Sequence, residues 1–101
     1  MPARRELADA PEHIITALRA ISGAARATVL RYVLKNPRAS HTEIVASTGV
    51  SRGSATTALR DLEALGYLHV DGPRQGRIVR YRADESSIAS DLTAVHDWFL
   101  R

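Results

Sequence analysis

The feature that most constrains the fold is a short turn leading into an amphipathic helix, over residues 48–68. Gly49 tolerates a positive φ angle, and the hydroxyl of Ser51 can cap the helix that follows. Gly66 is placed to end this helix, as a glycine just past a helix C-terminus commonly does. The apolar residues between these signals recur at helical spacing and share one face: Ala55, Leu59, Leu62 and Leu65.

The opposite face of this helix is small, polar and cationic at its N-terminal end. Gly53 costs about 0.5–1 kcal/mol relative to alanine in a helix, but it lets the backbone come close to a partner. Such a surface suits entry into a DNA major groove, where Arg52 could pair with guanine through two hydrogen bonds. An ordinary solvated helix surface is the alternative. We predict base-edge or phosphate contacts from Ser51, Arg52, Gly53, Ser54, Thr56, Thr57 and Arg60.

Two helices and a capping signal precede the turn. Ile14, Leu18 and Ile21 predict a first helix from residue 12, which the dipeptide at 22–23 breaks. A second helix ends before Asn36-Pro37, because proline disfavours helical geometry in the residue before it. The run at 40–43 has the S-x-x-E form of a capping box, which starts a third, short helix. This short helix, the glycine turn and the helix that follows form a helix-turn-helix. At its start, Ser40, His41 and Thr42 either present N–H groups to a DNA phosphate or serve only to cap the helix.

We call the amphipathic helix that follows Ser51 the recognition helix, and a hairpin is predicted after it. Residues 67–70 and 77–83 have strand character, and residues 71–76 contain the glycines and proline of a turn. Arginines at the tip and along one face suit contacts with the DNA backbone or minor groove, although charged edges also prevent aggregation. We predict such wing contacts from Arg74, Gln75, Arg77 and Arg80.

The last helix, predicted over residues 84–101, has a narrow heptad-like apolar seam. Its other face is polar, so we expect the seam to pair with a second copy, with completion of the monomer core as the alternative. The first helix is expected to contribute to the same interface. The predicted dimer residues are Ile14, Leu18, Ile21, Ile88, Leu92, Val95, Trp98 and Phe99.

Composition sets the remaining limits. The 101 residues suit a loose arm over residues 1–11, a DNA-binding domain over 12–83 and a dimerisation helix over 84–101. Residues 38–83 carry seven basic and four acidic side chains, whereas residues 84–101 carry one basic and four acidic, which points to a polyanionic partner for the middle of the chain. Cysteine is absent, no run approaches the ~20 apolar residues of a membrane span, and no catalytic constellation is present. We therefore expect a cytoplasmic protein that is not an enzyme and has no cofactor.

Residues 12–100 resemble an ArsR-type winged helix-turn-helix regulator, with MarR-type proteins a more distant match. The resemblance is carried by Arg26, by the turn at 49–51, by the segment Gly76–Tyr81, and by Thr56, Leu59, Leu62, Glu63, Gly66, Tyr67 and Leu68. It implies a mainly α fold with a small antiparallel β-hairpin, and a homodimer formed by the first and last helices. It also implies binding to double-stranded DNA at an imperfect palindrome in a promoter, as expected of a repressor.

Other functions remain open at this point. A protein-interaction module on the same fold is one alternative. A metal-responsive regulator is another, but the cysteines of many ArsR-type sensors are absent and the last helix offers only Asp91, His96 and Asp97. A zinc site would need His13 to meet His96 across the dimer, so we predict no metal site. Tyr32, Trp98 and Phe99 could line an effector pocket or belong to the core.

Overall fold

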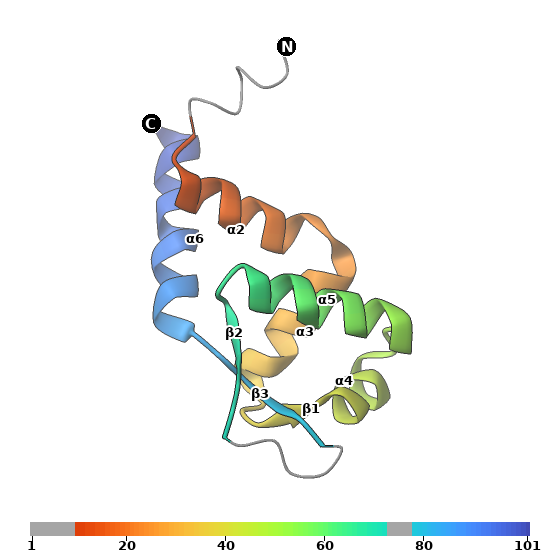
Figure 1. Ribbon diagram of the computed structural model, residues 1–101. Helices are drawn as coiled ribbons and strands as arrows, with labels where there is room; N and C mark the ends of the chain where they lie inside the picture. The colour runs from red at the N-terminus through yellow and green to blue at the C-terminus, as the bar shows by residue number, and fades with distance from the viewer. Residues whose placement is uncertain (1–9, 73–77) are drawn as a thin grey trace.

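The chain folds into a mainly helical structure with a small antiparallel sheet, as the sequence predicts (Figure 1). The computed structural model describes residues 10–72 and 78–101. The helices are α2 (Glu12–Ser22), α3 (Ala24–Lys35), α4 (His41–Thr48), α5 (Arg52–Ala64) and α6 (Glu85–Leu100). The strands are β1 (Ala39–Ser40), β2 (Leu68–Val70) and β3 (Arg80–Ala83).

Local capping signals set the helix ends around the turn. Ser40 caps α4 and Ser51 caps α5, each through a side-chain oxygen that accepts a backbone N–H. Gly49 has a φ of 77° and Gly66 a φ of 86°, in the left-handed region that favours glycine. The predicted ends of the recognition helix are therefore confirmed, and α4 and α5 form the helix-turn-helix.

The sheet has the order β1-β3-β2. In the hairpin, Leu68 lies opposite Ala83 and Val70 opposite Tyr81, which confirms the predicted pairing of the two strand segments. The strand β1 was not predicted from the sequence; its Ala39 pairs with Tyr81 on the other side of β3. Two residues are too few to show an alternating pattern, and their partner lies about forty residues later in the chain.

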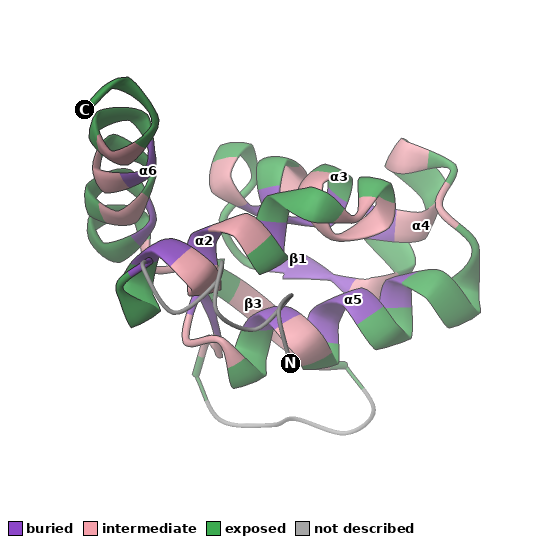
Figure 2. Ribbon diagram, turned by 90° about the horizontal axis from the view of Figure 1, so that it is seen from above, coloured by how far each residue is buried: buried purple, intermediate pink, exposed green. Residues whose placement is uncertain are grey.

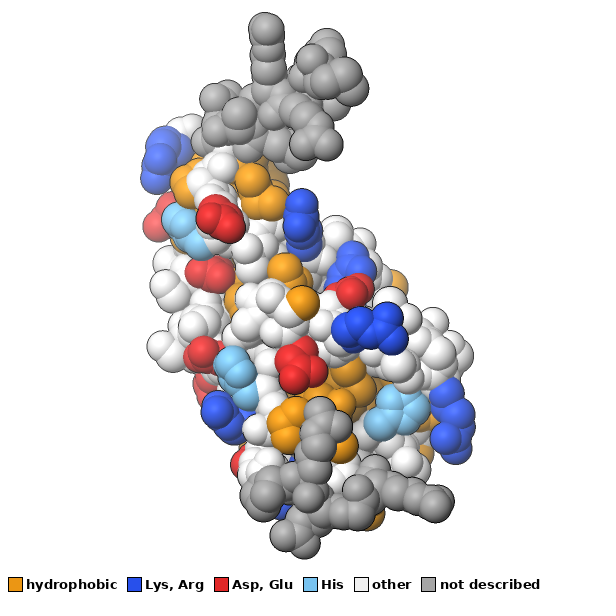
Figure 3. Space-filling model, in the orientation of Figure 1, with side chains coloured by type: hydrophobic (Ala, Val, Ile, Leu, Met, Phe, Trp, Pro, Cys, Tyr) orange, Lys and Arg blue, Asp and Glu red, His pale blue; other side chains and the backbone are white. Residues whose placement is uncertain are grey.

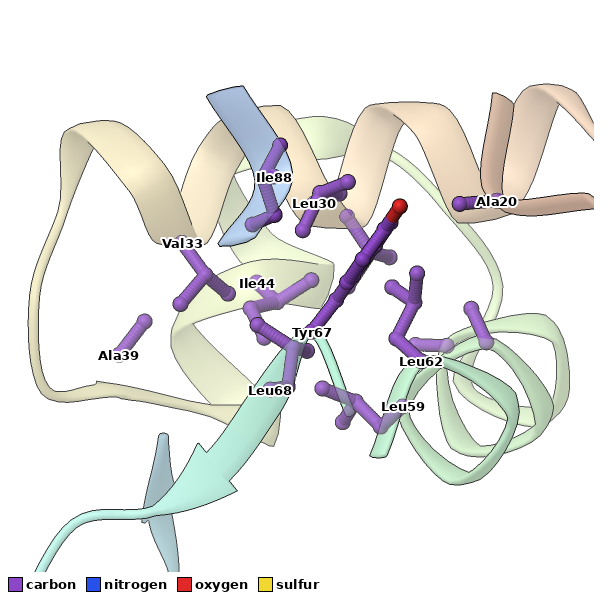
Figure 4. Packing of buried hydrophobic residues seen from close by; sticks show 13 residues of the cluster. Ala20, Leu30, Val33, Ala39, Ile44, Leu59, Leu62, Tyr67, Leu68 and Ile88 are labelled. Atoms are coloured by element: carbon purple, nitrogen blue, oxygen red, sulfur yellow. The ribbon is translucent and has the colours of Figure 1, made fainter. Parts of the chain in front are cut away.

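The main core lies between α3, α4, α5 and the sheet (Figure 4). Ile44, Leu62 and Leu68 are fully buried in it, and the Tyr67 ring stands among them with its hydroxyl at the outer end. Ile88, from the first turn of α6, completes this core. The recognition helix therefore rests on a packed base, which sets its position relative to the sheet.

A second, smaller cluster joins α2 to α6. It contains Ile14, Ala17 and Val95, with Trp98 packed against it. Figure 2 shows α6 at one end of the molecule, beside α2 and away from α4. On α2 the buried residues are Ile14, Ala17 and Ala20, whereas Ile21, which the sequence assigns to the dimer interface, is 44% exposed.

Candidate nucleic-acid interface

One face of α5 is open to solvent along the N-terminal half of the helix, and the opposite face is buried. The hydroxyl of Ser51 accepts a hydrogen bond from the backbone N–H of Ser54 at 3.2 Å, which holds the first turn. The buried face consists of Ala55, Ala58, Leu59 and Leu62. All seven residues that the sequence assigned to the recognition surface are exposed: Ser51, Arg52, Gly53, Ser54, Thr56, Thr57 and Arg60.

Two arginines on this helix, Arg52 and Arg60, are exposed. Within residues 10–72 and 78–101, neither the Arg52 nor the Arg60 guanidinium forms an ion pair or a hydrogen bond. Arg52 stands at the helix N-terminus, where backbone N–H groups lack helical partners and add partial positive charge. Figure 3 shows most Asp and Glu side chains on the side of α6, whereas Lys and Arg side chains lie on both sides of the molecule, several of them toward α5. The start of α5 is therefore suited to an anionic partner.

The side chain of His41, the first residue of α4, fastens this turn of α5. Its Nε2 lies 3.1 Å from the Arg52 carbonyl oxygen and 3.1 Å from the Thr56 hydroxyl. A carbonyl oxygen can only accept, so Nε2 donates to it, and the Thr56 hydroxyl donates to the same oxygen at 2.9 Å. His41 and Thr56 were both predicted to contact DNA, and in the structure their side chains contact each other. Among the described residues, Ser54 and Thr57 keep side-chain hydroxyls without a partner.

The start of α4 has the predicted capping box. The Ser40 hydroxyl accepts from the Glu43 N–H at 3.2 Å, and a Glu43 carboxylate oxygen accepts from the Ser40 N–H at 2.9 Å. This hydrogen bond from the Ser40 backbone, together with the Arg80 charge, lowers the pKa of Glu43. The Ser40 side chain is thus taken up by the cap, whereas Thr42 beside it is exposed.

Arg80 is held within the fold. Its Nη1 donates to the Arg38 carbonyl oxygen at 2.8 Å and to the Glu43 carboxylate at 3.3 Å. The sequence placed Arg80 on the wing as a DNA contact, but its bonds tie β3 to the start of α4. The other predicted wing residues, Arg74, Gln75 and Arg77, lie outside the described residues.

A groove runs between the two helices of the motif and the third strand. Its walls come from α4, α5 and the segment 78–81, so it follows the flank of the recognition surface. Among its lining residues are His41, Thr56, Leu59, Arg60, Ile78 and Tyr81.

The predicted dimer residues divide into three groups, of which Leu18 and Trp98 form the half-buried one. Ile14, Ile88 and Val95 are buried within the protomer, so α6 also serves the monomer core. Apolar surface remains exposed at Ile21, at Leu92 and at the last turn of α6, where Phe99 is 64% and Leu100 72% exposed. Trp98 packs edge-on against Phe99, with ring centroids 5.0 Å apart.

The described part of the chain has neither a cluster of metal-ligating side chains nor a membrane-spanning helix. No group of three or more His, Asp or Glu residues there is placed to hold a metal ion. None of the described helices is both long and apolar enough to cross a membrane. His96 contacts its neighbour Asp97 at 3.2 Å, on the exposed side of α6.

Comparison with solved structures supports the fold. An ArsR-like transcriptional regulator from Rhodococcus sp. RHA1 superposes with a TM-score of 0.70 at 20% identity, over 87% of this chain and 80% of that chain. The transcriptional repressor BigR from Xylella fastidiosa gives 0.69 at 18% identity, over 95% of both chains. NolR from Sinorhizobium fredii gives 0.68 at 19% identity, over 98% of this chain and 93% of that chain.

Comparison of sequences identifies the family. No curated protein matches the chain. The model of the MarR family matches residues 17–78, which run from α2 to the segment before β3. These residues include the whole helix-turn-helix. The sequence motifs resemble ArsR-type proteins first and MarR-type proteins second, and the matching family model is that of the second. The chain belongs to the MarR family and is a winged helix-turn-helix transcriptional regulator.

Proposed function

We propose that this regulator is a repressor that binds a palindromic operator as a homodimer. The observation that carries the proposal is the open outer face of α5, which starts at the Ser51 cap, rests on a packed base and carries Arg52 and Arg60, two cations unpaired within the described residues. In this arrangement Arg52 reads a base edge, and Ser54 and Thr57 contact bases or phosphates. BigR, which shares the fold, is named a transcriptional repressor, and this name supports the same role here.

Dimerisation supplies the second half of the recognition surface. The exposed apolar side chains of Ile21, Leu92 and Phe99 lie on α2 and α6, and these two helices pack against each other. A second copy that covers this face around a two-fold axis presents two α5 helices to one side of a duplex. Successive major grooves on one side lie about 34 Å apart, so the operator consists of two inverted half-sites at that separation.

Phosphate contacts complete the interface. Thr42 at the start of α4 lines the same groove as Thr56 and Arg60, and in this proposal Thr42 and the wing arginines Arg74 and Arg77 contact the flanking DNA backbone. A dimer that makes six to ten such contacts loses about 10³–10⁵-fold in affinity between 50 and 200 mM salt.

Selection of bound sequences from a random pool of duplex DNA tests this function. The proposal predicts enrichment of a two-fold symmetric site, and repression of a reporter whose promoter contains that site. Enrichment of no sequence, or of a single asymmetric half-site, would refute the proposed homodimer on a palindrome. Affinity that does not change with salt would refute binding to the DNA backbone.

A further inference from the structure

Arg26, near the start of α3, lies where three helices meet. Its Nε donates to the Arg19 carbonyl oxygen at 3.0 Å, and its Nη2 donates to the Ser22 hydroxyl at 3.4 Å. Its Nη1 donates to the Asp61 carboxylate on α5 at 3.2 Å. Each nitrogen of the guanidinium thus has one acceptor, two on the last turn of α2 and one on the recognition helix.

The surroundings of Arg26 make room for this arrangement. A Cβ at residue 23 would lie 2.9 Å from Arg26 Nη2, so the absence of a side chain at Gly23 leaves space for the guanidinium. The Arg19 carbonyl belongs to the C-terminal turn of α2, which carries partial negative charge and favours a cation. The planar fork of arginine can serve three acceptors in set directions, which the single ammonium of lysine cannot do.

The link connects two parts of the chain that have different tasks. Both α2 and α5 pack against α3, and α2 also packs against α6. Exposed apolar residues of α2 and α6 face the second copy in the proposed dimer, while α5 faces DNA. We propose that Arg26 is a positioning residue that sets the orientation of α5 relative to α2, and thereby the separation of the two recognition helices that the dimer accepts on DNA. This inference rests on the proposed function.

The solvent exposure of the Arg26–Asp61 pair distinguishes a positioning role from a contribution to folding stability. The Arg26 and Asp61 side chains keep 31% and 39% of their surface exposed. Ion pairs that are this accessible to water add little to folding stability. Removal of the pair is therefore expected to leave the fold intact but to let the angle between α2 and α5 vary more widely.

Affinity for a spacing series tests the proposal. The series joins two copies of the selected half-site, with the central spacer kept or changed by one or two base pairs. Wild-type protein is expected to bind the best spacing at least ~10-fold more tightly than its neighbours, because half-site separation is a geometric requirement of the dimer. Arg26→Gln and Asp61→Asn should lose ~10-fold on that spacing and discriminate less than ~3-fold among spacings, with the half-site sequence unchanged.

Controls distinguish the alternatives. Arg31→Gln, which removes an exposed arginine without a described partner from the same helix, should keep the wild-type spacing profile. Unchanged profiles in Arg26→Gln and Asp61→Asn would overturn the inference. A salt slope reduced by about one in Arg26→Gln alone would overturn it in favour of a phosphate contact. Loss of folding in both variants would show that the pair is needed for the fold, and would overturn it too. Failure of the wild type to select symmetric DNA would refute the proposed function itself, and this inference with it.

Discussion

The hydrogen bond between Tyr67 and Asp91 gives a quantitative prediction. The Tyr67 hydroxyl donates to an Asp91 carboxylate oxygen at 2.6 Å and so joins the start of the hairpin to α6. Tyr67→Phe keeps the ring, which is only 2% exposed, and removes the hydroxyl alone. A hydrogen bond to a charged acceptor contributes about 1.5–3 kcal/mol. Because Asp91 is half-buried and can regain water, we expect the lower end, ~1.5 kcal/mol.

Thermal unfolding measures this loss. One kcal/mol shifts the Tm of a domain of this size by roughly 4–8 °C, so Tyr67→Phe should melt about 6–12 °C lower than the wild type. Protein concentration must be equal in all samples, because a dimer has a concentration-dependent Tm. The matched control is Tyr32→Phe, which removes a hydroxyl that donates to the exposed Ser47 at 3.2 Å and should cost less. Equal melting of wild type and Tyr67→Phe would refute the assignment of stability to this bond.

Two further predictions concern pH and capping. Burial, together with the Asp91 carboxylate, raises the pKa of Tyr67, so the folded state favours the protonated phenol. The stability that the protonated phenol contributes is complete below the ordinary tyrosine pKa of ~10 and is lost as the pH rises beyond it. The Tm measured in a pH series above pH ~9 should therefore fall more steeply for the wild type than for Tyr67→Phe. Parallel curves for the two proteins would contradict this. Ser51→Ala removes the cap of α5 and should cost ~1 kcal/mol in a denaturant titration, and the frayed turn should also weaken DNA binding. Unchanged stability would show that the cap is dispensable.

The sequence predicted what local chemistry determines. Ser40, Ser51 and Gly66 act on residues within a few positions of themselves, so the helix ends could be assigned from spacing alone. The inward face of α2 could not, because isoleucine, leucine and alanine lie close together along the helix and packing against α3 and α6 selects among them.

Contacts between distant residues were also missed. His41 meets Thr56 fifteen residues later, and Arg26 meets Asp61 thirty-five residues later. Nothing in the spacing of these residues shows that they pair. The sequence could therefore name the exposed polar face of α5, but it could not separate the side chains that hold α5 from those without a bond among the described residues.

The most direct test of the central claim compares Arg52→Ala with Arg31→Ala in DNA affinity. Each change removes one exposed arginine, the first from the recognition surface and the second from α3. On the selected operator, Arg52→Ala should cost about 1–3 kcal/mol, with a much smaller change on a scrambled duplex and none for Arg31→Ala on either. Wild-type affinity of Arg52→Ala for the operator would contradict the claim that the start of α5 reads DNA.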